Sequence, residues 1–168
     1  MRLFIALNFE DSVVEMLTGF QEELRKNGVT GNFTPRENLH ITLAFIGEYG
    51  NPDDILDVME TVSFRPVELK FEGYQHYRDM YFARIAGNPG LESYVRRLRR
   101  ALAENGIPFD RKSFKPHITL ARKVSFRNGG LEGIPKIDDQ NSFVAQRVSL
   151  MLSERGKNGM IYTELGGL

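Results

Sequence analysis

Cysteine and tryptophan are both absent from this sequence of 168 residues, and neither sign of charge is in excess, since 22 basic side chains balance 22 acidic ones. Without cysteine the chain has no disulfide and no thiolate ligand for a metal. Proteins that hold long nucleic acids by their phosphates carry a strong basic excess. We therefore expect any nucleic-acid partner to be recognised over a short stretch or at an end.

Long apolar runs are also missing. No stretch approaches the roughly 20 apolar residues of a membrane span, and the apolar start, Leu3 to Leu7, is too short for a signal peptide. A hydrophobic content of 41% is ordinary for a globular protein. A chain of this length most simply forms one domain, residues 1–168. We expect that domain to be cytoplasmic.

Histidine is scarce, and two of the three histidines lie in identical pentapeptides, His-Ile-Thr-Leu-Ala, at residues 40–44 and 117–121. Successive side chains of a β-strand point to opposite faces. His40 therefore shares a face with Thr42, and His117 shares one with Thr119. Each copy is predicted to be a strand with one apolar face for the core and one face that carries an imidazole and a hydroxyl group.

The elements around these strands are repeated too. Alternating apolar residues predict strands, and apolar residues at helical spacing predict helices. Strands are expected at residues 2–9, 39–46, 67–74, 80–85, 114–123, 144–152 and 160–165, and helices at 11–26, from 52, and at 91–104. The order strand, helix, histidine strand thus occurs twice, over residues 2–47 and 80–123. We predict a duplicated α+β fold whose pseudo-twofold axis brings both His-Thr pairs to one groove.

Two histidines in one groove suit acid–base chemistry on a phosphodiester. An imidazole titrates at about pH 6.5, so one ring can be neutral while the other is protonated. The neutral ring takes a proton from the nucleophile, and the charged ring gives one to the leaving group. Thr42 and Thr119 are candidate donors to the phosphate oxygens, and Arg122 adds a guanidinium group that the first copy lacks.

These residues resemble the two-histidine (2H) phosphoesterase superfamily, and within it the RNA 2′,3′-cyclic phosphodiesterases, historically called 2′-5′ RNA ligases. The resemblance rests on two His-x-Thr-x motifs, at residues 40–43 and 117–120. The flanks agree: Pro-Arg-Glu-Asn-Leu precedes the first motif, Phe-Lys-Pro precedes the second, and Ala121-Arg122 follows the second. With the segments 3–7 and 148–162, the resemblance covers nearly the whole chain.

The resemblance implies a bilobal fold with antiparallel sheets lining a central groove and helices outside. It also implies hydrolysis of a terminal 2′,3′-cyclic phosphate of RNA to a 2′-phosphomonoester, without metal or cofactor, and a reversible 2′-5′ joining of RNA. His40 would be the proton donor and His117 the proton acceptor. The residues alone leave that order open. A two-lobed chain that completes its own site needs no partner subunit, so we expect a monomer.

Other interpretations remain open at this point. The same machinery suits ADP-ribose 1″,2″-cyclic phosphate or a 2′-5′ oligonucleotide as substrate. A non-catalytic module that binds phosphorylated RNA ends is a hypothesis of a different class. A zinc site built from His40, His117 and His76 is disfavoured, because no carboxylate lies at ligand spacing near either motif.

Four aromatic residues are candidates to stack on a terminal base: Phe9, Phe45, Tyr81 and Phe114. Relatives often carry tryptophan seven residues before the first motif histidine, where this chain has the smaller ring of Phe33. The densest positive run, four arginines within residues 96–100, is predicted to be mainly a solvated face of the third helix.

Overall fold

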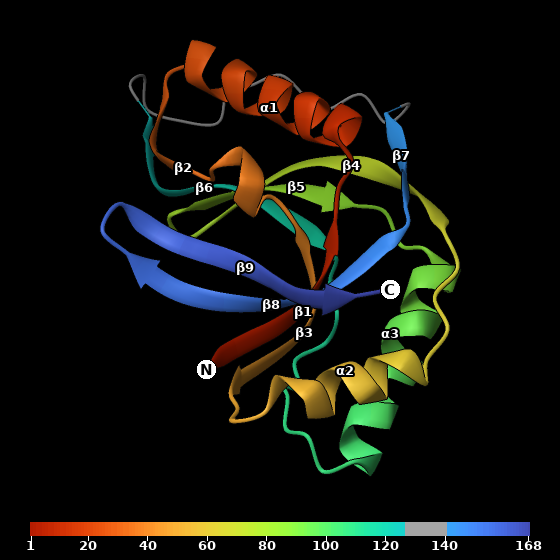
Figure 1. Cartoon of the computed structure of the whole chain (residues 1–168). Coiled ribbons are helices and arrows are strands. Elements are labelled where there is room, and N and C mark those ends of the chain that lie inside the picture. The colour runs from red at the N-terminus through yellow and green to blue at the C-terminus, as the bar shows by residue number, and fades with distance from the viewer. Residues whose placement is uncertain (127–140) are drawn as a thin grey trace.

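The computed structural model describes residues 1–126 and 141–168, which form two antiparallel β-sheets with three α-helices packed against them (Figure 1). The four-stranded sheet has the order β3-β1-β8-β9, and the five-stranded sheet has the order β2-β6-β5-β4-β7. The first sheet contains β1 (Arg2–Asn8), β3 (Ile41–Glu48), β8 (Arg147–Gly156) and β9 (Gly159–Gly167). The second contains β2 (Val29–Phe33), β4 (Val67–Tyr77), β5 (Met80–Ile85), β6 (His117–Phe126) and β7 (Ser142–Ala145).

The helices are α1 (Asp11–Lys26), α2 (Pro52–Glu60) and α3 (Pro89–Glu104). Both α2 and α3 begin with a proline that follows a capping asparagine. The side chains of these asparagines, Asn51 and Asn88, each accept a hydrogen bond from a backbone N–H of the first turn. In Figure 1, α1 lies over the five-stranded sheet, and α2 and α3 lie together on the opposite side of the molecule. Within the described ranges, no helix is long and apolar enough to cross a membrane.

The predicted duplication is confirmed. β1 pairs with the first histidine strand, β3, and β5 pairs with the second histidine strand, β6. A helix follows the first strand of each pair, α1 in one half and α3 in the other. The core is one continuous cluster that joins both sheets: Ile5 of β1 and Leu120 of β6 are both fully buried within it.

Two strands differ from the prediction made from the sequence. The pattern does not predict β2, whose only buried residue is Val29 and which contains Gly31 and Asn32, both poor strand formers. The single strand expected at residues 144–152 is in fact two strands: β7 pairs with β4, and β8 pairs with β1 and β9. The chain passes from one sheet to the other at Gln146. Apolar residues occur both before and after Gln146, so the hydrophobic pattern of the sequence does not show where one strand ends and the next begins.

Candidate active site between the histidine strands

Each histidine strand contains a β-bulge at the leucine of the repeated pentapeptide. On β3, Thr42 pairs with Ala6 and Ala44 pairs with Ile5, so Leu43 is an extra residue without a partner on β1. Leu43 and Ala44 are both fully buried. The alternation of faces therefore restarts one residue later than it would in an unbroken strand.

The second histidine strand has the equivalent bulge. On β6 the extra residue is Leu120, which lies between the partners of Phe82 and Tyr81 on β5. The two bulges have the same effect on the residue that follows the pentapeptide. Phe45 on β3 and Arg122 on β6 come to lie on the face that carries the histidine and the threonine of their own strand.

Both imidazole rings are anchored in the same way. His40 lies just before β3, after the 3₁₀ turn η1 (Arg36–Asn38), and His117 is the first residue of β6. In each ring Nδ1 lies 2.7 Å from a backbone carbonyl oxygen two residues earlier, that of Asn38 or Lys115. A carbonyl oxygen only accepts, so Nδ1 carries the hydrogen in both rings. Nε2 is thus the nitrogen that each histidine offers for proton transfer.

The ring of His40 is half-buried between aromatic side chains. Its centroid lies 5.0 Å from that of Phe4 and 5.4 Å from that of Tyr162, which meets it edge-on. Its Nε2 lies 2.9 Å from Oγ1 of Thr42. The predicted sharing of one face by His40 and Thr42 is seen directly in this contact.

Burial lowers the pKa of His40 below its ordinary value. The hydrogen bond to the carbonyl of Asn38 opposes this shift, and the positive charges of His117 and Arg122 lower the pKa further. Charge effects between solvent-exposed groups are largely screened beyond about 10 Å at ordinary ionic strength. The histidine strands β3 and β6 also approach each other directly. The structure therefore brings both histidines and Arg122 into one electrostatic cluster.

His117 is more open than His40. Its ring is exposed to solvent and leans on Phe82, with the two centroids 4.5 Å apart. Thr119 is half-buried on the same strand. The exposed guanidinium group of Arg122 donates through Nη1 to the sulfur of Met80, 3.0 Å away. The second half thus presents a solvated imidazole and an exposed positive charge.

The candidate stacking residues lie in different places. Phe45 is half-buried on the histidine face of β3, and the guanidinium carbon of Arg2 lies 5.0 Å from its ring centre. Phe9 is half-buried and meets Phe143 edge-on, with centroids 5.3 Å apart. Both rings keep part of their surface open.

The other two aromatic candidates are less accessible from the groove. Phe114 faces Arg99 of α3, whose guanidinium carbon lies 5.9 Å from the ring centre. Tyr81 has only 3% of its surface exposed, too little for a base to lie flat against its ring. His76 stacks on Tyr81 from β4. Among the described residues, no group of three or more His, Cys, Asp or Glu side chains is placed to hold a metal ion.

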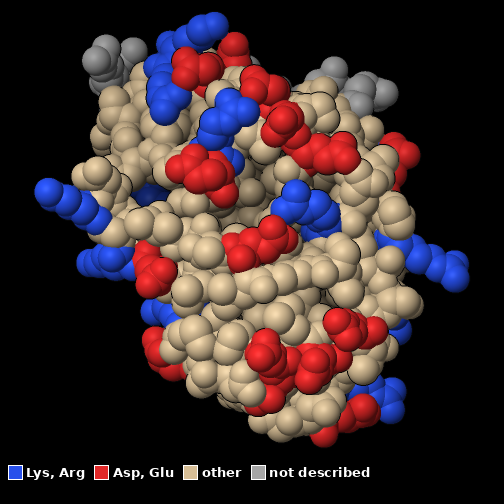
Figure 2. Space-filling view, viewed as in Figure 1, with Lys and Arg blue, Asp and Glu red and all other residues tan. Residues whose placement is uncertain are grey.

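A hollow of about 520 Å³ adjoins the first histidine, and Tyr162 belongs to both its wall and the aromatic surroundings of His40. The space-filling view shows this face hollowed between α1 and strands β8 and β9, with charges of both signs on the rim (Figure 2). Its lining comprises Asn8, Phe9, Asp11, Val14, Arg36, Glu37, Leu39, Arg147, Met151, Tyr162 and Glu164.

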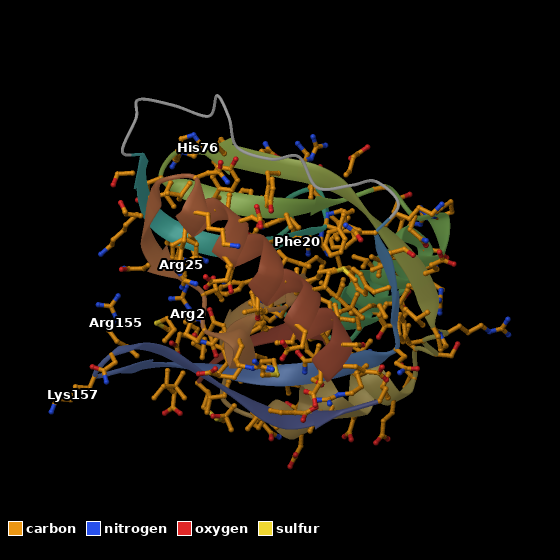
Figure 3. All side chains as sticks on the ribbon, turned by 90° about the horizontal axis from the view of Figure 1, so that it is seen from above. Arg2, Phe20, Arg25, His76, Arg155 and Lys157 are labelled. Atoms are coloured by element: carbon orange, nitrogen blue, oxygen red, sulfur yellow. The ribbon has the colours of Figure 1, made fainter. Side chains whose placement is uncertain are left out.

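Basic side chains gather at another end of the molecule. Arg2, Arg25, Arg155 and Lys157 all project toward the same end (Figure 3). They come from the start of β1, the end of α1, the end of β8 and the turn between β8 and β9. Arg2 lies over Phe45, which comes after the histidine motif on β3. The basic end therefore lies beyond Phe45 in the direction in which β3 leaves His40.

Several residues of the site are not singled out by the sequence. Phe4 lies in an uninterrupted apolar strand, so the pattern does not show that it faces the groove and not the core. Tyr162 comes from the last strand, far from either motif. Gln21 and Arg99 lie on helices, and their side chains donate hydrogen bonds to the backbone carbonyls of the bulge residues Leu120 and Leu43.

Comparison with known proteins extends these observations. The model of the 2′-5′ RNA ligase superfamily matches residues 12–156. A curated protein of Archaeoglobus fulgidus named RNA 2′,3′-cyclic phosphodiesterase is 32% identical, with 98% of each chain covered. One of Methanocaldococcus jannaschii with the same name is 26% identical, with 96% of each chain covered.

The fold has solved counterparts as well. The crystal structure of TT0787 from Thermus thermophilus superposes with a TM-score of 0.80 at 26% identity, covering 100% of this chain and 97% of that one. LigT of E. coli in apo form gives a TM-score of 0.81 at 22% identity, covering 99% and 95%. With a family match over most of its length and a pair of His-x-Thr motifs on strands that contact each other, this chain belongs to the 2′-5′ RNA ligase superfamily.

Proposed function

We propose that the protein hydrolyses the terminal 2′,3′-cyclic phosphate of RNA to a 2′-phosphomonoester. The observation that carries this proposal is the matched pair of histidines on strands that approach each other, each with Nδ1 tied to a carbonyl oxygen, which leaves Nε2 as the nitrogen for proton transfer. The relatives named RNA 2′,3′-cyclic phosphodiesterase support the choice of substrate.

In the proposed reaction, Nε2 of neutral His117 takes a proton from water while the water oxygen forms a bond to phosphorus. The bond between phosphorus and O3′ breaks, and the proton on Nε2 of His40 passes to O3′. One water is consumed, and a 2′-phosphomonoester and a 3′-hydroxyl are formed. His40 is then neutral and His117 protonated, and proton exchange with solvent restores the starting state.

The hydroxyl groups of Thr42 and Thr119 and the guanidinium group of Arg122 are the proposed donors to the non-bridging oxygens. These oxygens gain negative charge in the transition state, so fixed donors stabilise it more than the ground state. Thr42 already lies beside the reactive nitrogen of His40. Arg122 supplies the one positive charge among these three residues.

The lowered pKa of His40 is at first sight unfavourable for a proton donor. The cyclic phosphate, however, carries a negative charge, and an anion bound beside the ring favours the protonated form. We therefore propose that His40 becomes protonated as the substrate binds. His117, which is exposed, remains free to act as the base.

The RNA strand is proposed to leave the groove toward the basic end formed by Arg2, Arg25, Arg155 and Lys157 (Figure 3). Phosphates are attracted there, whereas the rim of the hollow beside His40 includes acidic side chains such as Asp11 and Glu164. Phe45 and Phe9 are the proposed stacking rings. We further propose that the protein acts as a monomer, because one chain supplies both histidines. We also propose that it acts in the cytoplasm.

The test is direct. The purified protein is incubated with an oligonucleotide that ends in a 2′,3′-cyclic phosphate, in the presence of a chelator, and the product isomer is identified by ³¹P NMR. The proposal expects only the 2′-monoester and no loss of rate with chelator. A 3′-monoester, or binding without turnover, would contradict it. Faster turnover of ADP-ribose 1″,2″-cyclic phosphate than of the RNA end would show that the same reaction serves a different substrate.

A further inference from the structure

At each bulge, the backbone carbonyl of the extra leucine accepts a hydrogen bond from a helix side chain. The carbonyl oxygen of Leu43 accepts from Nε and Nη2 of Arg99, at 3.2 and 3.1 Å. The carbonyl oxygen of Leu120 accepts from Nε2 of Gln21 at 3.0 Å. The Leu120 carbonyl also accepts from the backbone N–H of Thr34 at 2.9 Å, so Gln21 adds a second bond there, whereas Arg99 provides two bonds to the Leu43 carbonyl. Such bonds stabilise buried carbonyl groups.

The two donors occupy equivalent places. Gln21 lies on α1 and Arg99 on α3, the matching helices of the two halves, at the same position counted from the helix start. Each also reaches a second carbonyl, in the loop ahead of the histidine of its own half. Gln21 donates to Thr34 at 2.9 Å, and Arg99 donates through Nη1 to Lys112 at 2.7 Å.

The connections cross between the halves. Gln21 belongs to the half of His40 but holds the bulge beside Thr119, and Arg99 belongs to the half of His117 but holds the bulge beside Thr42. Gln21 is 4% exposed and Arg99 is half-buried, so neither is an ordinary surface side chain. The expectation that the arginine run is mainly a solvated face is therefore wrong for Arg99.

We propose that Gln21 and Arg99 are positioning residues that fix the two histidine strands relative to each other. Each bulge decides which face the following residue takes, and each cross-connection fixes the bulge against the other half. Gln21 thereby sets the placement of Thr119 and Arg122, and Arg99 sets that of Thr42 and the adjacent His40. The catalytic consequence rests on the proposed function, whereas the placement of the strands does not.

Methionine is the matched substitution at both positions, since it keeps an unbranched stem but has no N–H donor. Gln21→Met and Arg99→Met are each expected to lower kcat by about ten- to a hundredfold, because displacements near 1 Å at a reacting centre have effects of that order. KM should stay within about twofold. The controls are Glu22→Met and Arg100→Met, exposed neighbours on the same helices whose side chains form surface ion pairs.

A purely structural role would lower the unfolding temperature but not the turnover of the folded protein. Rates are therefore measured well below the unfolding transition and expressed per folded molecule, as counted by circular dichroism. Arg99→Lys, which keeps the charge but not the planar fork, is a milder variant if Arg99→Met fails to fold. Full turnover by the folded methionine variants would overturn the proposal.

A sulfur-substituted substrate tests the crossed pairing itself. A cyclic phosphate with sulfur in place of O3′ has a leaving group that needs no proton, so it should relieve a defect at the proton donor only. Arg99→Met should then behave as His40→Ala does, and Gln21→Met as His117→Ala does. With His40 as the donor, sulfur should relieve Arg99→Met and leave Gln21→Met impaired. The opposite correspondence would overturn the proposal.

Backbone NMR separates this inference from the proposed function. In Gln21→Met the amide shifts should change most at Thr119 and Arg122, and in Arg99→Met at Thr42 and Phe45. That result stands even if no cyclic phosphate is hydrolysed. Changes confined to the half that carries the substitution would overturn the crossed arrangement while leaving the wild-type activity untouched.

Discussion

The two histidine strands share a backbone frame but differ in their surroundings. Both have a histidine with Nδ1 held by a carbonyl at 2.7 Å, a threonine two residues later, and a bulge at the next leucine. His40, however, is half-buried against Phe4 and Tyr162, whereas His117 is exposed. Beyond the bulge, the first strand carries Phe45 and the second carries Arg122.

This difference shows how a duplicated frame can give two unequal catalysts. Two imidazoles in identical surroundings would have the same intrinsic affinity for a proton, so neither would be fixed as donor or acceptor. Burial and the neighbouring positive charges lower the pKa of His40, whereas His117 leans on Phe82 with its ring open to solvent. Unequal environments separate the two rings chemically, and the anion bound beside His40 then favours its protonated form.

The largest effect is expected from removing either imidazole. His40→Ala and His117→Ala should each lower kcat by about 10²- to 10⁴-fold, the usual contribution of general acid–base catalysis. The double variant should lose far less than the product of the two effects, because the residues act as a unit. Steady-state rates on a cyclic-phosphate oligonucleotide measure this.

His76→Ala is the matched control, since His76 lies on β4 and stacks on Tyr81 outside the groove. Its turnover should stay within about twofold of wild type. A full rate in either His40→Ala or His117→Ala would contradict the shared roles of the two strands.

The second prediction concerns the residue after each bulge. Arg122→Met should lower kcat by about 10²- to 10³-fold, comparable to losing one donor to a developing oxyanion. The exchange variant Phe45→Arg with Arg122→Phe should not recover activity, because the guanidinium group then lies beside His40 and lowers its pKa further. Recovery in the exchange variant would mean that the two sides of the site are interchangeable.

Strict alternation along the strand fails at these positions. By that rule Arg122 shares a face with Ile118 and Leu120 and points into the core, and Phe45 shares one with Ile41 and Leu43. The pentapeptide repeat correctly predicts the faces of the histidines and threonines. It does not reveal the bulge, because a leucine in a bulge and a leucine in a regular strand are equally apolar.

The rest of the fold divides along similar lines. The helices and the repeated order of strand, helix and histidine strand follow from local periodicity and the pentapeptide repeat, which the sequence shows. The crossing at Gln146 and the edge strand β2 depend on partners far away in the chain. Arg99 illustrates the same limit, since its role is fixed by the distant carbonyl of Leu43 and not by the arginines beside it.

The third prediction is a separation between two pH profiles. His40 must be protonated to act, so activity falls as the pH rises through its pKa. In the free protein that pKa is lowered, so kcat/KM, which reports the free enzyme, should begin to fall at a lower pH than it would with an ordinary histidine. In the complex the bound anion raises the pKa, so kcat should fall only at higher pH. If kcat and kcat/KM fell at the same pH, the result would contradict the protonation of His40 on substrate binding.

The smallest expected effect is at Phe45. Phe45→Ala removes a half-buried ring from the histidine face of β3, and loss of a stacked base costs about 1–3 kcal/mol in single-stranded complexes. Because the ring does not touch the reacting atoms, KM should rise and kcat should hardly change.

Phe114→Ala, on the side of Arg99, serves as a comparison and should leave KM for RNA unaltered. Kinetics on oligonucleotides and on a mononucleoside cyclic phosphate would show whether the first strand contributes binding while the second contributes charge. An equal loss of kcat in Phe45→Ala and Arg122→Met would remove that distinction between the two strands.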